Sequence, residues 1–285
     1  MNPLDNELLK LYEKLNLLYF LIHFLDNRME TAIQKVNQQK ERTNGDDWIR
    51  PFHGTSLVIT DLTGPTDNGW LLFGRTGLVK VQGEEFVEKL SWVAQREGAL
   101  AIAKAYEAFE TYLYDLTATY GFKIDTTRLH KILKLSPNVT ELTSLEKWKE
   151  AIRYKYRRGK NKKLINKLRK LGDGLELAEN KTTNNRSLNM VSWFKVVEQV
   201  RHAVTHSDFV IKQAVLSSFQ PEEKSILSQR FPGSESNTGY LIEMDKHNSA
   251  LAIQFFAEYA HAIYKSLSTQ SDLEWINHLA RKNDG

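Results

Sequence analysis

Apolar residues recur at intervals of three and four along much of the chain, a period typical of amphipathic helices. The first such run extends from about Asn6 to Lys40, with apolar positions at Leu8, Leu11, Leu15, Leu18, Ile22 and Leu25. A second run, from Glu84 to about Tyr120, is the most regular in the chain, and Gly121 after it is a candidate helix stop. The pattern predicts two long amphipathic helices.

Short runs of β-forming residues separate these two helices. TSLVIT, WLLFG and GLVKV fall between residues 53 and 83, bounded by Gly, Pro, Asn and Asp. Such runs predict a two- or three-stranded hairpin unit inserted on a helical scaffold. We therefore expect two domains, residues 1–85 with the N-terminal helix and the β-rich unit, and residues 86–285 with a helical bundle.

The remainder of the chain is also mainly helical in its pattern. Further helices are expected near 127–135, from Ser144 into a basic segment, over 190–206, after Pro221, over 249–267 and near 272–281, with a brief strand at GYLIEM. The predicted fold class is mainly α, a helical bundle with a long N-terminal helix and a small β-hairpin insert.

Positive charge is concentrated in one segment, Arg153 to Lys170, which contains ten basic residues and no acidic one. These residues are Arg153, Lys155, Arg157, Arg158, Lys160, Lys162, Lys163, Lys167, Arg169 and Lys170. The chain's net charge is only +4, so the rest of it is acidic overall. This asymmetry favours a polyanionic partner, and the interleaved Tyr154 and Tyr156 can stack on unpaired bases. The alternative is a solvated lysine-rich face.

Cysteine is absent from the chain, which excludes disulfides, thiolate metal sites and a cysteine nucleophile. This composition fits a reducing intracellular compartment, so a cytoplasmic protein is expected. The apolar run from Leu15 to Leu25 is too short to span a bilayer, which needs about 20 residues, and no membrane association is expected.

The helix expected over 190–206 carries an unusual set of polar residues near its end. On a helical wheel its core face consists of Met190, Trp193, Phe194, Val197, Val200 and Val204. Glu198, His202 and His206 align on a polar face, whereas Arg201 lies at the edge of the apolar arc. A half-buried guanidinium needs an internal carboxylate or an incoming phosphate.

Two interpretations of these residues do not involve RNA. Arg201 can form a structural ion pair with Glu107, Glu110 or Asp115, while the histidines cap the C-terminal end of the helix. Alternatively, Glu198, His202 and His206 can present three metal ligands on one face. Neighbouring Arg201 and Lys195 would repel a dication, and the zinc-protease pattern is absent. No metal or other cofactor is therefore expected.

The third interpretation is a resemblance. RHAVTH, with Arg201, His202 and His206, resembles the signature of the HEPN superfamily: arginine, then Asn, Asp or His, three arbitrary residues, and histidine. AYEAFETYLYDL, residues 105–116, resembles the family's earlier bundle helix, and the resemblance covers about residues 86–268. It implies a HEPN-like helical bundle that dimerises and is either a metal-independent endoribonuclease or a noncatalytic RNA-binding or protein-interaction module. A toxin or antiphage role, with an antitoxin or regulatory protein as partner, belongs to the first case.

The resemblance also implies roles for the motif residues. His206 would act as acid or base, Arg201 would bind the phosphate, and His202 would orient the nucleophile or hold hydrogen bonds, with Glu198 in support. Arg201 and His206 diverge by about 140° on an ideal helix, which is awkward for one phosphate. A cleft between the subunits of a homodimer, or a helix that unwinds after Thr205, would relieve this divergence, and we expect the homodimer.

Overall fold

The computed structural model of the chain describes residues 2–42, 52–55, 58–60, 71–73, 79–81, 83–136, 138–157 and 160–275. Most of the described residues lie in helices and few lie in strands, so the predicted mainly α fold class is confirmed. None of the described helices combines the length and the apolar composition needed to cross a membrane.

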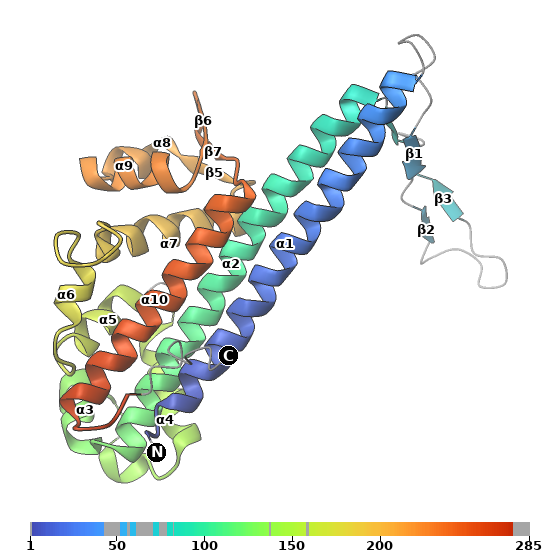
Figure 1. Cartoon of the computed structure of the whole chain (residues 1–285). Helices are drawn as coiled ribbons and strands as arrows, with labels where there is room; N and C mark the ends of the chain where they lie inside the picture. Colours follow the sequence, from blue (N-terminus) through green and yellow to red (C-terminus); the bar gives the residue numbers. More distant parts are fainter. Residues whose placement is uncertain are drawn as a thin grey trace, which may run out of the picture. The chain divides into compact units, whose positions relative to one another are not determined.

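Packing divides the chain into two compact units, residues 24–95 and residues 1–23 together with 96–285. The two long helices, α1 (Asp5–Arg42) and α2 (Gly83–Lys123), each contribute to both units (Figure 1). Both helices were expected from the apolar period. The predicted domain division after residue 85 stays a prediction.

The described residues of the unit 24–95 include four short strands, more than the two or three that the sequence predicted. They are β1 (Phe52–Thr55), β2 (Val58–Thr60), β3 (Leu71–Phe73) and β4 (Val79–Val81). β1 pairs with β4 and β2 with β3, both antiparallel. The predicted hairpin character of this insert is therefore confirmed.

The other unit contains the remaining helices and a small antiparallel sheet. The helices are α3 (Thr126–Leu133), the 3-10 helix η1 (Val139–Glu141), α4 (Leu145–Tyr156), α5 (Asn161–Leu168), α6 (Leu175–Glu179), α7 (Met190–His206), α8 (Gln213–Ser218), α9 (Pro221–Arg230) and α10 (Lys246–Gln270). The sheet has the order β5-β7-β6, formed by Val210–Lys212, Gly239–Ile242 and Gly233–Ser236. The sequence predicted the central strand and missed its two neighbours.

Two helices begin directly after a residue whose side chain caps the helix. The side chain of Ser144 accepts from the backbone N–H of Lys147 at the start of α4, and Asn189 accepts from Ser192 at the start of α7. Each cap satisfies a backbone donor that has no partner within its helix. The start of the motif-bearing helix is thereby fixed at Met190, as predicted.

Two predicted helix limits were wrong or untested. Gly121 does not stop α2, which continues to Lys123. A Cβ there would lie 2.5 Å from Leu129 and 2.6 Å from Trp148, so this glycine permits α2 to pack closely on α3 and α4. Of the final helix expected near 272–281, residues 272–275 are not helical and the rest lies outside the described residues.

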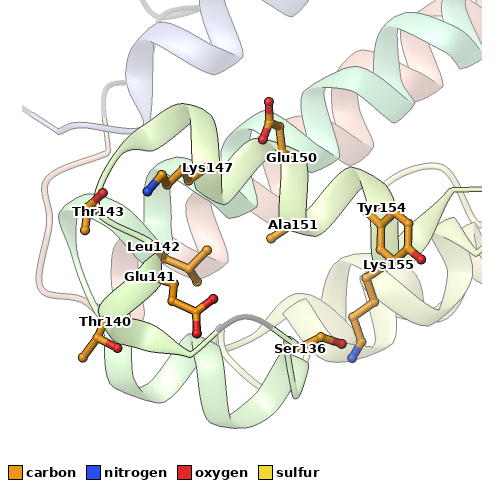
Figure 2. A pocket seen from close by; sticks show the side chains of 10 residues that line it. All are labelled: Ser136, Thr140, Glu141, Leu142, Thr143, Lys147, Glu150, Ala151, Tyr154 and Lys155. Carbon is orange, nitrogen blue, oxygen red and sulfur yellow. The ribbon is translucent and has the colours of Figure 1, made fainter.

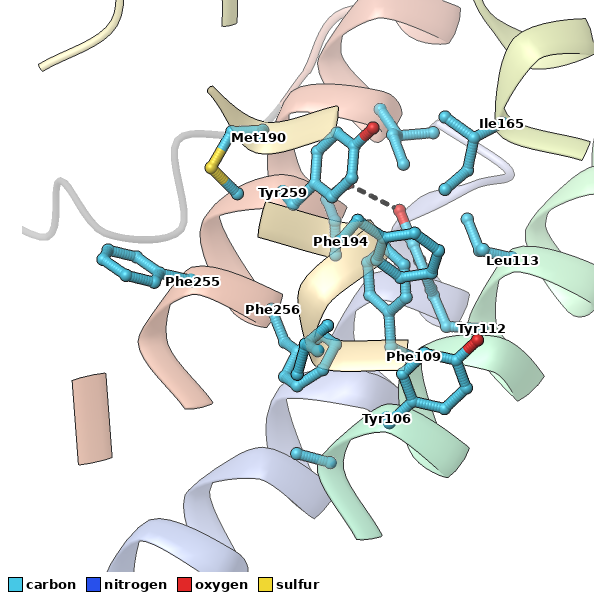
Figure 3. Packing of buried hydrophobic residues seen from close by; sticks show 14 of the residues in the cluster. Tyr106, Phe109, Tyr112, Leu113, Ile165, Met190, Phe194, Phe255, Phe256 and Tyr259 are labelled. Atoms are coloured by element: carbon cyan, nitrogen blue, oxygen red, sulfur yellow. Dashed lines mark hydrogen bonds between the residues drawn. The ribbon is translucent and has the colours of Figure 1, made fainter. Parts of the chain in front are cut away.

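Aromatic rings from α2, α7 and α10 form the centre of the core (Figure 3). The Phe109 ring lies 5.5 Å from Phe194, 5.4 Å from Phe256 and 5.8 Å from Tyr259, measured between centroids. Tyr106 stacks on Phe194 at 5.5 Å. Fully burying one such ring stabilises a fold by about 1.5 to 3 kcal/mol. This cluster fixes α7 between α2 and α10 and thus positions the polar end of α7.

Candidate functional site

The polar end of α7 has the arrangement that the helical wheel predicts. Val197, Val200 and Val204 are buried, whereas His202 and His206 are exposed. α7 continues through His206, and the backbone N–H of Ser207 donates to the carbonyl of Ala203. The helix therefore does not unwind after Thr205, and the divergence between Arg201 and His206 is not relieved within one chain.

The two histidines form a pair on the exposed face. Their ring centroids are 5.1 Å apart with an interplanar angle of 53°. Partial desolvation lowers the pKa of His202, and the charges of His206, Arg201 and Lys212 lower it further. A lowered pKa keeps this imidazole neutral near neutral pH, the form that can accept a proton.

Arg201 lies half-buried beside α2 without a close carboxylate. Its Nη2 is 3.9 Å from Glu107 Oε1, beyond hydrogen-bond distance, and its guanidinium carbon is 6.0 Å from the centroid of the Tyr106 ring. The buried Nε has no hydrogen-bond partner among the residues that the structure describes. Glu107 is therefore the acid, of the three considered, that contacts Arg201. At 3.9 Å, however, it accepts no hydrogen bond from the guanidinium.

Glu110 and Asp115, the other two candidate acids, are engaged elsewhere. Glu110 accepts from Asn161 Nδ2 at 2.7 Å and from the Tyr114 hydroxyl at 3.0 Å. Asp115 accepts from Arg153 at 2.9 Å. The acids that would most simply neutralise Arg201 are therefore already bound to other donors.

A polar network connects the motif to the basic segment. Tyr106 donates its hydroxyl proton to Glu198 Oε1 at 3.4 Å and accepts from Asn161 Nδ2 at 3.0 Å. Asn161, fully buried, is the first residue of α5. Burial raises the pKa of Glu198, while its hydrogen bond with Tyr106 and the charge of Lys162 oppose this increase. The start of α5, with its lysines, is thereby joined to the Glu198 side of α7.

The residues of the basic segment differ in their internal partners and in their exposure to solvent. Arg169 donates to buried Glu179 at 2.6 and 2.8 Å, Arg153 pairs with Asp115, and Lys155 donates to the carbonyl of Lys134. Exposed members are Arg153, Arg157, Lys160, Lys162, Lys163 and Lys170, whereas Lys155 and Lys167 are partly buried. Arg158 lies outside the described residues.

Two residues of the predicted RNA-binding set are in structural roles. Tyr156 is 4% exposed and belongs to the core, so it cannot stack on a base as expected. Arg169 has Nε and Nη2 directed to Glu179, and this carboxylate also accepts from Tyr259 at 2.6 Å. The remaining aromatic residue of the segment, Tyr154, is 69% exposed.

Several residues of the site were not found from the sequence. Tyr106 and Asn161 hold Glu198 in place, and Glu179 neutralises Arg169. Asn161 did carry a signal, because it is a short amide within a run of lysines, at a position suited to a helix start. Nothing in the local sequence distinguished Glu179 from exposed acids.

The metal alternative is not supported by the placement of side chains. Across the described ranges, no three or more His, Asp or Glu residues are grouped so that they could hold a metal ion. Glu198, His202 and His206 therefore do not form the three-ligand set that their spacing allows.

The chain matches no protein-family model, no curated protein and no solved structure. The resemblance of RHAVTH to the HEPN signature therefore stays a prediction. A functional assignment depends on the residues and on their geometry.

Proposed function

We propose that the chain is a metal-independent endoribonuclease whose site contains Arg201, His202 and His206 and is completed in a homodimer. The observation that carries this proposal is the state of Arg201. Its side chain is 29% exposed and its nearest carboxylate contact is 3.9 Å long, whereas its Nε is buried and has no hydrogen-bond partner among the described residues. Such a cation is suited to an incoming phosphate.

The proposed chemistry needs groups that this site supplies. One His206 removes the proton of the 2′-hydroxyl, and the 2′-oxygen attacks the phosphorus atom. Arg201 stabilises the negative charge that develops on the phosphate oxygens. The bond to the 5′-oxygen breaks, and this oxygen takes a proton from the second copy of His206. The products are a 2′,3′-cyclic phosphate and a 5′-hydroxyl, and no co-reactant is consumed.

His202 and Glu198 act as positioning residues in this proposal. His202 lies 5.1 Å from His206, ring to ring, and its lowered pKa keeps it neutral. Glu198 is held by Tyr106 and, through Tyr106, by Asn161. These contacts restrict the side-chain motions of the polar face, which is what a precise site requires.

The test is cleavage of single-stranded RNA in excess EDTA, followed by identification of both product ends. We expect a 2′,3′-cyclic phosphate and a 5′-hydroxyl, and we expect His206→Ala to reduce the rate by about 100- to 10,000-fold. Thr205→Ala is the matched control, because Thr205 is the exposed neighbour and its hydroxyl bonds only within α7 to the Arg201 carbonyl at 2.9 Å and the His202 carbonyl at 3.5 Å. Products with 5′-phosphates that require Mg²⁺ would overturn the mechanism.

A second experiment tests the composite site. Arg201→Ala and His206→Ala proteins, each inactive, are mixed under conditions that permit subunit exchange. If one arginine and one histidine from different subunits suffice, the mixture regains part of the activity; if all four groups are needed, it stays inactive although dimeric. Full activity of a strict monomer, established by light scattering at the assay concentration, would refute the shared site.

The second candidate function is a noncatalytic RNA-binding or protein-interaction module. The position of Glu107 favours it, since a carboxylate 3.9 Å from Arg201 already offsets part of the charge that a phosphate would meet. In that case, purified protein binds RNA without cutting it, and Glu107→Gln strengthens the binding. An antitoxin or regulatory partner, and a role as toxin or in antiphage defence, belong to the endoribonuclease proposal.

A further inference from the structure

A hollow of about 800 Å³ lies between α4 and the segment that includes η1, away from the motif on α7. Figure 2 shows Tyr154, Lys155 and Ser136 at one end, Thr140 and Thr143 at the other, and Leu142 between them. Pockets for small ligands measure about 300 to 1,000 Å³, so one nucleotide fits here. The walls combine an aromatic ring, aliphatic side chains, hydroxyls and the amines of Lys147 and Lys155, and they also include the carboxylates of Glu141 and Glu150. Rings, hydroxyls and amines are groups that contact nucleotides, and the carboxylates place the phosphate at the Lys155 end.

Tyr154 provides an exposed ring at the edge of this hollow. It is 69% exposed, whereas Tyr156, two residues later on the same helix, is 4% exposed. The guanidinium carbon of Arg157 lies 4.5 Å from the centroid of the Tyr154 ring. A cation on one face of the ring leaves the opposite face for a nucleobase, and such stacking accepts any base.

Positive charge gathers at the same end of the hollow. Lys155 donates its ammonium proton to the carbonyl oxygen of Lys134, the left-handed residue that ends α3. Desolvation lowers the pKa of Lys155, and repulsion from Lys167, Lys134 and Lys160 lowers it further. The charges of Lys134, Lys160 and Lys167 therefore act on the ammonium group of Lys155, the one of these four lysines that lines the hollow. A phosphate placed among them would replace this repulsion with attraction.

We propose that this hollow binds one unpaired nucleotide of single-stranded RNA, with the base stacked on Tyr154 and a phosphate beside Lys155. The identity of the polyanion as RNA rests on the proposed function. The site deepens that function because it names the form of the substrate: a base inside a duplex is already stacked on both faces and cannot enter. The basic segment thus recognises single-stranded RNA rather than any polyanion.

The test is fluorescence anisotropy with a labelled single-stranded 2′-O-methyl RNA, which lacks the 2′-hydroxyl and is not cut. Tyr154→Ala should weaken binding by about 5- to 150-fold, since stacking on an aromatic residue contributes about 1 to 3 kcal/mol per base. Tyr154→Phe keeps the ring and should bind as the wild type does. Phe122→Ala, which removes a ring that is 41% exposed outside the hollow, is the matched control and should have no effect.

Three outcomes would overturn the proposal. Tyr154→Ala could bind single-stranded RNA as tightly as the wild type does. It could lose affinity equally for the duplex of the same sequence, which would assign the segment to backbone contacts alone. A free mononucleotide could bind as tightly as the oligonucleotide, which would make the ligand a small molecule.

The same protein preparations separate this proposal from the proposed catalysis. If the wild type fails to cut unmodified RNA in EDTA but binds the methylated RNA through Tyr154, the nuclease proposal fails and the nucleotide site stands. If it cuts RNA while Tyr154→Ala binds normally, the reverse holds.

Discussion

Arg169 and Arg201 have nearly the same exposure and opposite surroundings. Their side chains are 30% and 29% exposed. Arg169 donates two hydrogen bonds of 2.6 and 2.8 Å to Glu179, which is 5% exposed and also accepts from Tyr259. Arg201 reaches one carboxylate, that of Glu107, at 3.9 Å. The first arginine is neutralised by a buried carboxylate, and the second retains capacity for a ligand.

This difference shows that burial and charge alone do not identify a functional arginine. Arg169 lies within the run of ten basic residues and would be assigned to RNA by composition. The hydrogen bonds to Glu179 raise the pKa of Arg169, and burial raises the pKa of Tyr259, so both groups stay protonated and donate to the carboxylate. The two arginines differ in the hydrogen bonds that the fold gives them: Arg169 donates to a buried carboxylate, and Arg201 has one contact of 3.9 Å.

Substituting each arginine with methionine should reveal the difference most strongly. Arg169→Met leaves Glu179 buried without its cation, and we expect the free energy of unfolding to fall by about 3 to 5 kcal/mol. Arg201→Met removes a cation with one long contact and an unsatisfied Nε, so we expect a change within about 1 kcal/mol. Urea denaturation followed by circular dichroism measures both. Equal losses in the two variants would contradict the comparison.

The carboxylates that contact the two arginines, Glu179 and Glu107, provide the second comparison. Glu179→Gln removes the charge from a buried group with three donors, and a loss of about 2 kcal/mol is expected. Glu107→Gln affects a 38% exposed carboxylate that contacts Lys104 at 2.9 Å and Arg201 at 3.9 Å, and a loss below about 0.5 kcal/mol is expected. The same denaturation experiment applies, with Lys104→Ala as the control for the lysine contact. A loss at Glu107 as large as that at Glu179, without a comparable loss in Lys104→Ala, would mean that Arg201 is locked in place.

The smallest expected effect is on the titration of His202. Its pKa lies below the ordinary value of 6.5, so between these two values the folded chain binds fewer protons than the unfolded chain. The stability linked to His202 is therefore present above the ordinary pKa and is lost as pH falls through the folded pKa. Arg201→Met should raise the pKa of His202 and Arg169→Met should not. NMR titration of the imidazole signals measures the pKa of His202 in each variant. An unchanged pKa in Arg201→Met would contradict the proximity of Arg201 and His202.

Much of the fold was predictable because the apolar period of a helix is local information. α1, α2, α7 and α10 were all expected, and α7 begins at Met190 and ends at His206 as predicted. β5 was missed because three residues carry too short a pattern, and β6 because its sequence, GSES, contains no β-forming apolar residue. Gly121 was misassigned as a helix stop, since a glycine that permits close packing looks the same in a sequence as one that ends a helix.

The site was predictable only in part. The alignment of His202 and His206 on one face follows from their spacing, and their rings do lie together. The pairing of Arg169 with Glu179 and the burial of Tyr156 depend on tertiary packing of α5, α6 and α10, which no local pattern contains. Asn161, which links Tyr106, Tyr114 and Glu110, connects residues about fifty positions apart in the chain.

The most direct test compares the RNA cleavage rates of Arg201→Met and Arg169→Met in EDTA, expressed per folded molecule. The account predicts that Arg201→Met stays folded and loses about 100- to 1,000-fold in rate, as expected when a group that stabilises the transition state is removed. It predicts that the folded fraction of Arg169→Met cleaves within about twofold of the wild-type rate, because in the wild type the guanidinium of Arg169 is bound to Glu179. Full activity in Arg201→Met, or equal losses per folded molecule in both variants, would contradict the central claim that the guanidinium of Arg201 is reserved for phosphate.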